Sequence, residues 1–97
     1  MMKTGIIYWR RKPDLTTALA QADIEERIEA ARQAHAEVKA PFLAVLAEFD
    51  GAQVNDQPGT GQCIISVPED RWSALVELAL AHPDVTLKPN FVITSAA

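Results

Sequence analysis

Residues 62–88 read QCIISVPEDRWSALVELALAHPDVTLK and contain the pattern strand, helix, strand. The first six residues are rich in β-branched side chains, which favour a strand. Pro68 suits the first turn of a helix, and apolar residues then recur at helical spacing as far as Ala79. The sequence His82-Pro83-Asp84 ends this helix. Residues 85–88 alternate between apolar and polar side chains, which predicts a second strand.

Two further strands are expected upstream of this segment. Residues 52–56 indicate a short strand, and the turn sequence Gln57-Pro58-Gly59-Thr60-Gly61 follows them. This strand and the strand that begins at Gln62 are therefore predicted to form a hairpin. Residues 5–10 are rich in β-branched and aromatic side chains and precede Pro13, so they are predicted to form the first strand of the chain.

Between these strands, residues 24–50 are expected to form one long helix. Asp23 suits its N-cap and Gly51 suits its end. Pro41 removes one backbone donor and should bend the helix near Glu37. The helix would be ~40 Å long, about twice the length of a short strand, so its first half should overhang the sheet, fold back or meet a partner. The apolar residues that predict it follow steps of four and three: Ile24, Ile28, Ala31, His35, Val38, Phe42, Val45 and Phe49.

The order strand, helix, strand, strand, helix, strand is that of the ferredoxin-like, split β-α-β folds. It predicts an α+β protein with a four-stranded antiparallel sheet, and right-handed crossovers place both helices on one face of that sheet. The other face then has no cover from its own chain, which usually marks an interface. Tyr8 and Trp9 point to opposite faces of the first strand, so one of them faces away from the helices. Our candidates for a sheet-face interface are Tyr8, Trp9 and Ile64.

Length and composition indicate one small domain, residues 1–97. The chain has 97 residues, of which 48% are hydrophobic and 23% are charged, as in an ordinary globular protein. Its net charge of -4 argues against binding to nucleic acid or to an anionic membrane. No apolar run approaches the ~20 residues of a membrane helix, and residues 1–12 lack the pattern of a secretory signal. We therefore expect a cytoplasmic protein or an already processed segment of a secreted one.

Few residues could support catalysis or hold a metal ion. The chain has one cysteine and two histidines, and it lacks the spacing of a metal-ligand cluster. Cys63 alternates with apolar residues and is expected to be a buried thiol, whereas His35 lies on the apolar stripe and His82 at a helix end. We therefore expect no catalytic residue, no metal and no cofactor, and the protein is not predicted to be an enzyme. A pocket enclosing His35 or Cys63 would favour a small enzyme instead.

The last residues of the chain form a short uncharged segment. Residues 91–93 are apolar and residues 94–97 are small. Such a segment can bind in a cleft as an extended peptide, by main-chain pairing and by placing side chains in pockets. A frayed terminus is the alternative interpretation. The candidate binding residues of this C-terminal tail are Phe91, Val92, Ile93, Thr94, Ser95, Ala96 and Ala97.

Several short stretches occur in the order and spacing of a known family. They are Ile6-Ile7-Tyr8, Ala34-His35-Ala36, Pro41-Phe42-Leu43, residues 49–54, residues 64–69 and Ala81-His82-Pro83-Asp84-Val85. Through them the chain resembles the propeptide-like inhibitors of subtilisin-type serine proteases, over most of residues 4–93. Residues 14–29 are similar to the extended amino-terminal helix of larger bacterial subtilase prodomains.

This resemblance implies a function and a partner. The open sheet face would pack against surface helices of a subtilisin-like serine protease, and the tail would lie in the substrate cleft like a product. Ala97 would fill the first pocket, with residues 94–96 behind it. In such a family the attached domain guides folding of the protease, and the separate chain inhibits it. The alternative is a homodimeric ferredoxin-like structural or regulatory module without inhibitory activity, formed by the open sheet face or by pairing of the long helix with a copy of itself.

Overall fold

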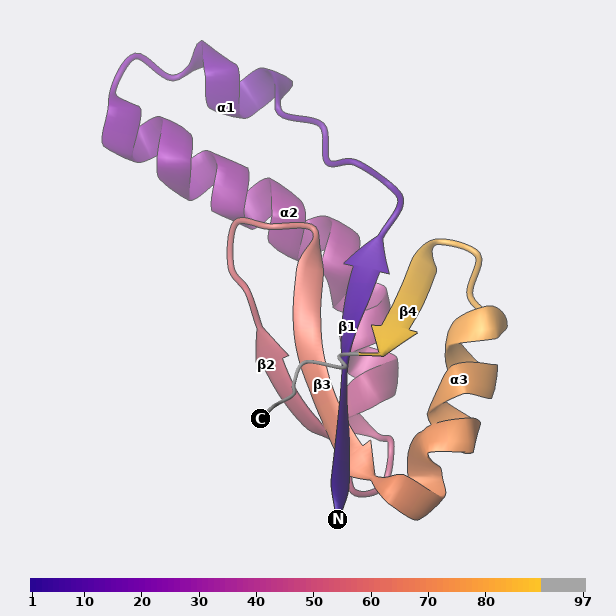
Figure 1. The fold of residues 1–97 in the computed structure, drawn as a ribbon. Coiled ribbons are helices and arrows are strands. Elements are labelled where there is room, and N and C mark those ends of the chain that lie inside the picture. Colours follow the sequence, from indigo (N-terminus) through magenta and orange to yellow (C-terminus); the bar gives the residue numbers. More distant parts are fainter. Residues whose placement is uncertain (90–97) are drawn as a thin grey trace.

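The computed structural model describes residues 1–89 and confirms the predicted order of elements (Figure 1). One short helix, α1, is added before the long helix α2. The elements are β1 (Met2–Trp9), α1 (Thr16–Ala20), α2 (Ile24–Ala47), β2 (Gln53–Asp56), β3 (Gln62–Pro68), a 3-10 turn (Glu69–Arg71), α3 (Trp72–Leu80) and β4 (Val85–Pro89). The split β-α-β fold class is therefore confirmed.

The four strands form one antiparallel sheet in the order β2-β3-β1-β4. The central strand β1 begins three residues earlier than the sequence predicts, because Met2 and its neighbours pair with the end of β3 as far as Pro68. On its other side, β1 pairs with β4 from Gly5 opposite Pro89 to Trp9 opposite Val85. β2 pairs only with β3, so β2 and β4 are the two edges of the sheet.

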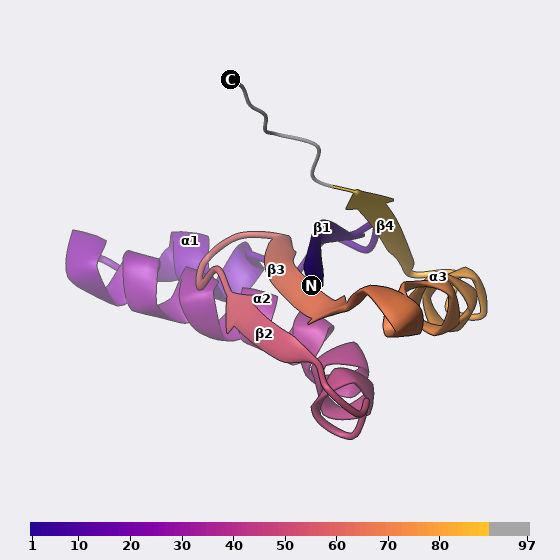
Figure 2. The same cartoon turned by 60° about the horizontal axis from the view of Figure 1, so that its bottom comes forward.

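One hydrophobic core lies between the sheet and the two longer helices. Buried residues alternate with half-buried ones along β1 and β3, so these strands present one face to the core. α2 and α3 both contribute to the same buried cluster and therefore cover the same face of the sheet, as predicted (Figure 2). The cluster comprises Ile7, Trp9, Phe42, Leu46, Cys63, Ile65, Val67, Leu75, Ala79 and Val85.

Helix α2 is continuous through Pro41 and ends three residues before the predicted end. The Asp23 carboxylate accepts a hydrogen bond from the Glu25 backbone N–H at 2.9 Å, which confirms the N-cap. Beyond Ala47 the chain turns, and Gly51 adopts a positive φ of 81° before β2 begins. The bend expected near Glu37 stays a prediction. None of the helices within residues 1–89 is long and apolar enough to cross a membrane.

The first half of α2 extends beyond the sheet, and α1 lies alongside it (Figure 1). Ala18 of α1 is buried, whereas Ile24 and Ile28 of α2 are 70% and 50% exposed. The predicted overhang is therefore present, and the apolar stripe of α2 is buried only where the sheet lies against it. The physical reason is length, since the 24-residue helix is longer than any strand of the sheet.

Candidate functional site

The candidate site is the face of the sheet that none of the helices within residues 1–89 covers. Figure 1 looks onto this face, with α2 behind the strands. Strand register assigns its residues, because side chains that share a face alternate along each strand and lie opposite one another across strands. We call this surface the open face, and it consists of Met2, Thr4, Ile6, Tyr8, Gln53, Asn55, Gln62, Ile64, Ser66, Pro68, Thr86 and Lys88.

The centre of the open face is apolar. Ile6 of β1 lies directly opposite Ile64 of β3, and Tyr8 follows Ile6 on the same side of β1. All three are half-buried by their neighbours in the sheet. An apolar centre of this kind gains free energy when a partner removes it from water.

Polar groups surround this centre and are themselves ordered. The hydroxyl groups of Thr4 and Ser66 lie 2.9 Å apart and share a hydrogen bond. The Lys88 ammonium lies 5.4 Å from the centre of the Tyr8 ring, within the range of a cation–π interaction. An apolar centre with a polar rim is the usual anatomy of a protein–protein interface.

The structure places the three predicted face residues on both sides of the sheet. Tyr8 and Ile64 lie on the open face, where Tyr8 of β1 is opposite Gln62 of β3, and Ile64 of β3 is opposite Ile6 of β1. Trp9 points the other way and is 8% exposed, with its ring packed edge-on against Phe42 at 6.1 Å between centroids. Trp9 is therefore a core residue, and its inclusion among the face candidates was wrong. The predicted binding residues 91–97 lie outside the described part of the chain.

Apart from Tyr8 and Ile64, the members of the open face were not among the candidates from the sequence, and Ile6, Thr4, Ser66 and Lys88 are the most informative of them. For Ile6 and Thr4 the signal was present, since they lie two and four residues before Tyr8 on the same strand. Lys88 required the register between β1 and β4, which the sequence alone does not give.

A buried ion pair lies on the opposite side of the sheet. Lys39 of α2 is 1% exposed, and its ammonium donates hydrogen bonds to Asp56 Oδ1 at 2.6 Å and to the Gln57 carbonyl at 3.0 Å. The same ammonium lies 5.5 Å from the centre of the Trp9 ring. Asp56 remains partly open to solvent, with 38% of its side chain exposed. These contacts fasten the end of β2 to α2, so we assign the pair a structural role.

Cys63 is completely buried beside this pair, which confirms the prediction of a buried thiol. Burial raises the pKa of the Cys63 thiol from 9.0 to about 11, because the thiolate would lose its hydration; the charge of Lys39 opposes this shift. The thiol is therefore protonated at neutral pH and is a poor nucleophile. Across residues 1–89, no group of three or more His, Cys, Asp or Glu residues could hold a metal ion.

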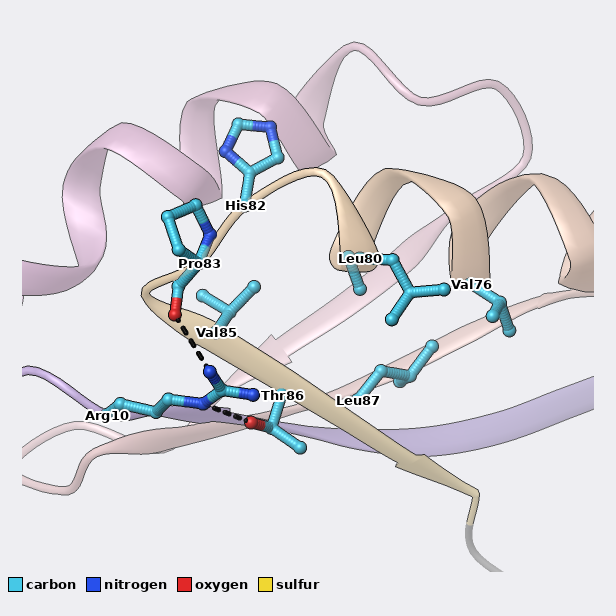
Figure 3. A pocket seen from close by; sticks show the side chains of 9 residues that line it. Arg10, Val76, Leu80, His82, Pro83, Val85, Thr86 and Leu87 are labelled. Atoms are coloured by element: carbon cyan, nitrogen blue, oxygen red, sulfur yellow. Dashed lines mark hydrogen bonds between the residues drawn. The ribbon is translucent and has the colours of Figure 1, made fainter.

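Two hollows flank the corner formed by His82 and Pro83. The first has a volume of about 140 Å³ and lies between α3 and β4, where Val76, Leu80 and Leu87 gather (Figure 3). There the Arg10 guanidinium donates to Thr86 Oγ1 at 2.7 Å and to the Pro83 carbonyl at 3.2 Å. Arg10 thereby ties the end of β1 to the start of β4.

The second hollow has a volume of about 250 Å³ and lies between α2 and the start of β4. The His82 ring packs edge-on against Phe42 there, with 4.9 Å between their centroids. Neither of these two hollows is lined by His35 or Cys63, the two side chains whose enclosure would have favoured an enzyme. The open face therefore remains the stronger candidate for function.

Comparison of the chain with protein-family models, with curated proteins and with solved structures found no match.

Proposed function

We propose that this protein inhibits a subtilisin-like serine protease, or assists its folding, and that the open face is the surface that docks on the protease. The observation that carries the proposal is the uncovered apolar centre formed by Ile6, Tyr8 and Ile64, with its ordered polar rim. The resemblance implies docking by this same surface. The role is one of binding, and no residue is assigned to catalysis.

The second part of the proposal concerns the C-terminal tail. Pro89, the last described residue, lies opposite Gly5 in the sheet, so the chain enters the tail from a strand that is already fixed. A tail held at one end by a folded domain loses less entropy on binding than a free peptide. In this proposal residues 94–97 lie product-like in the substrate cleft, with Ala97 in the first pocket.

The experiment that tests this function is residual activity of a broad-specificity subtilisin incubated with the full chain. Two variants separate the contribution of the tail from that of the open face. The first is a chain that ends at Ile93, and the second is Ile64→Arg, which places a charge at the centre of the open face. Leu80→Arg is the matched control, because Leu80 is 80% exposed on α3 and lies outside the open face. Circular dichroism checks that each variant is folded.

Inhibition by the full chain and by Leu80→Arg, lost in the other two variants, supports the proposal. Inhibition that recovers with time means that the domain binds and is then digested, as expected of a prodomain. Full inhibition by Ile64→Arg would contradict docking by the open face. The absence of inhibition by the folded full chain would count against this function.

The alternative function is a homodimeric module closed by the open face. The same apolar centre favours it, because two copies of Ile6 and Ile64 could cover one another across a two-fold axis. This alternative predicts a dimer that Ile64→Arg converts to a monomer, together with no effect on subtilisin.

A further inference from the structure

The end of the molecule remote from the open face carries a second uncovered surface. We call residues 24–35, the first half of α2, the overhang (Figure 1). Ile24 and Ile28 on this segment are 70% and 50% exposed, and Leu19 at the end of α1 is 70% exposed. Large apolar side chains are thus gathered at this end, where water meets them directly.

Helix α1 does not cover this surface. Ala18 of α1 lines a hollow together with Ala30 and Ala34 of α2, so α1 lies along that side of the overhang. At 100° per residue, Ile24 and Ile28 lie on a different side of α2. They continue the stripe that is buried further along the helix at Phe42.

The spacing of this stripe is that of a coiled-coil seam. Ile24, Ile28, Ala31 and His35 follow steps of four, three and four residues, which places them along one line of contact with a second helix. If that helix is a second copy in antiparallel orientation, Ile28 of each copy lies against Ala31 of the other. Ile24 lies against His35 in the same way. Each exposed large side chain therefore meets a smaller or half-buried one.

Charges beside the seam select this arrangement. Glu25 and Arg32 each follow a seam residue directly and so flank the seam on the same side. In the antiparallel arrangement, Glu25 of each copy lies beside Arg32 of the other. Neither charge takes part in an ion pair within residues 1–89, where Lys39 pairs with Asp56, and the aliphatic part of Arg32 lies beside Gly59 of the β2–β3 turn.

The competing arrangements bring like charges together. A parallel pair places Arg27 of one copy beside Arg32 of the other. An antiparallel pair shifted by one heptad places Ile24 of one copy against Ile28 of the other. In that register Glu25 of one copy faces Glu25 of the other, and the two copies of Arg27 also face one another. Like charges at these flanking positions are unfavourable, and they therefore disfavour both arrangements.

We propose that the overhang is a self-association surface through which two copies of this chain pair in antiparallel orientation. The surface shares no residue with the open face, since α2 packs on the opposite side of the sheet. Each dimer would therefore present two open faces. The proposal is independent of the proposed function, because pairing through the overhang does not require protease binding.

The test is sedimentation equilibrium of the full chain over a range of concentrations, with reversed charges beside the seam. The wild-type chain is expected to form a concentration-dependent dimer. Glu25→Arg and Arg32→Glu should each be monomeric, because each brings two pairs of like charges together. An equimolar mixture of the two variants should form a 1:1 heterodimer, and the double variant E25R/R32E should form a homodimer again.

Glu26→Arg is the matched control, because it makes the same charge change in the same turn of α2 on the side away from the seam. It is expected to leave the dimer unchanged. A wild-type chain that stays monomeric throughout would overturn the proposal. Failure of the mixture or of the double variant to associate would also overturn it, as would a dimer abolished by Ile64→Arg and insensitive to the charge changes.

Discussion

The ammonium group of Lys39 lies 2.6 Å from Asp56 Oδ1, yet the two side chains differ greatly in their access to water. Lys39 is 1% exposed, whereas 38% of the Asp56 side chain is exposed. The cost of breaking the pair should therefore depend on which partner is removed, because a buried charge left without its partner is the more unfavourable product.

We expect Asp56→Ala to destabilise the protein by about 3 kcal/mol, since it leaves the buried ammonium with only the Gln57 carbonyl as a hydrogen-bond acceptor. Lys39→Met should cost less than about 1.5 kcal/mol, because methionine fills a similar volume and Asp56 can turn to water. Urea denaturation of both variants measures the difference. Equal losses would contradict the asymmetry.

Gly5 is expected to tolerate no side chain. A Cβ atom at this position would lie 2.8 Å from the edge of the Trp72 ring and 3.1 Å from the Lys88 carbonyl oxygen. Gly5→Ala should therefore lower the free energy of unfolding by about 1–3 kcal/mol. Thermal denaturation provides the measurement.

Gly61→Ala is the control for this substitution, because the nearest atom to its Cβ would be 3.8 Å away, and it should be nearly neutral. Combining Gly5→Ala with Trp72→Phe removes one of the three atoms that crowd the new methyl group and leaves Leu87 Cδ1 at 2.9 Å and the Lys88 carbonyl oxygen at 3.1 Å. The loss in the double variant should then be smaller than the sum of the two single losses.

The two adjacent aromatic residues of β1 should separate stability from function. Trp9→Ala removes a core side chain and should cost about 3–5 kcal/mol of stability. Tyr8→Ala removes a half-buried side chain on the open face, so it should cost less stability but weaken inhibition of subtilisin. Urea denaturation and residual protease activity, measured on both variants, test the contrast. Unchanged inhibition by a folded Tyr8→Ala variant would argue against a role for this ring.

Cys63 should make the stability of the protein fall in alkaline solution. In the folded protein burial raises its pKa to about 11, whereas the thiol of an unfolded chain ionises near the ordinary pKa of 9.0. Between these values the unfolded state binds fewer protons than the folded state, so the free energy of unfolding decreases as the pH rises from about 9 to about 11. Chemical denaturation at several pH values measures this decrease.

Cys63→Ala should lose this part of the pH dependence and keep that of the remaining groups. Native Cys63 should also react slowly with a thiol reagent at pH 8, and quickly after denaturation. Fast reaction of the native protein would show that the thiol is accessible.

The order of elements and the overhang could be predicted from the sequence, because both depend on local properties. Alternation in residues 62–67, proline at position 68 and the length of the apolar stripe from Ile24 are each visible along the chain. The end of α2 was placed three residues too late, at Asp50, because helix ends depend on weak capping contacts that the stripe does not specify.

The candidate site was only partly predictable. Alternation shows that Tyr8 and Trp9 face opposite ways, but only packing of the helices decides which one is covered. From the sequence alone, Lys39 is expected to be an exposed helix residue. Its burial depends on hydrogen-bond acceptors from Asp56 and Gln57, which lie in a hairpin distant in sequence. Membership of Lys88 in the open face likewise depends on a strand register formed across the whole chain.

The central position of β1 has a consequence for how the chain folds. β1 precedes both of its partner strands by a long stretch of chain: Thr4 bonds Ser66, 62 residues away, and Arg10 bonds Thr86, 76 residues away. Contacts of such long range slow folding, because a large loop must close before they form. During synthesis, therefore, β1 remains unpaired until β3 and β4 have been made, whereas the α1–α2 pair and the β2–β3 hairpin can form earlier from local contacts.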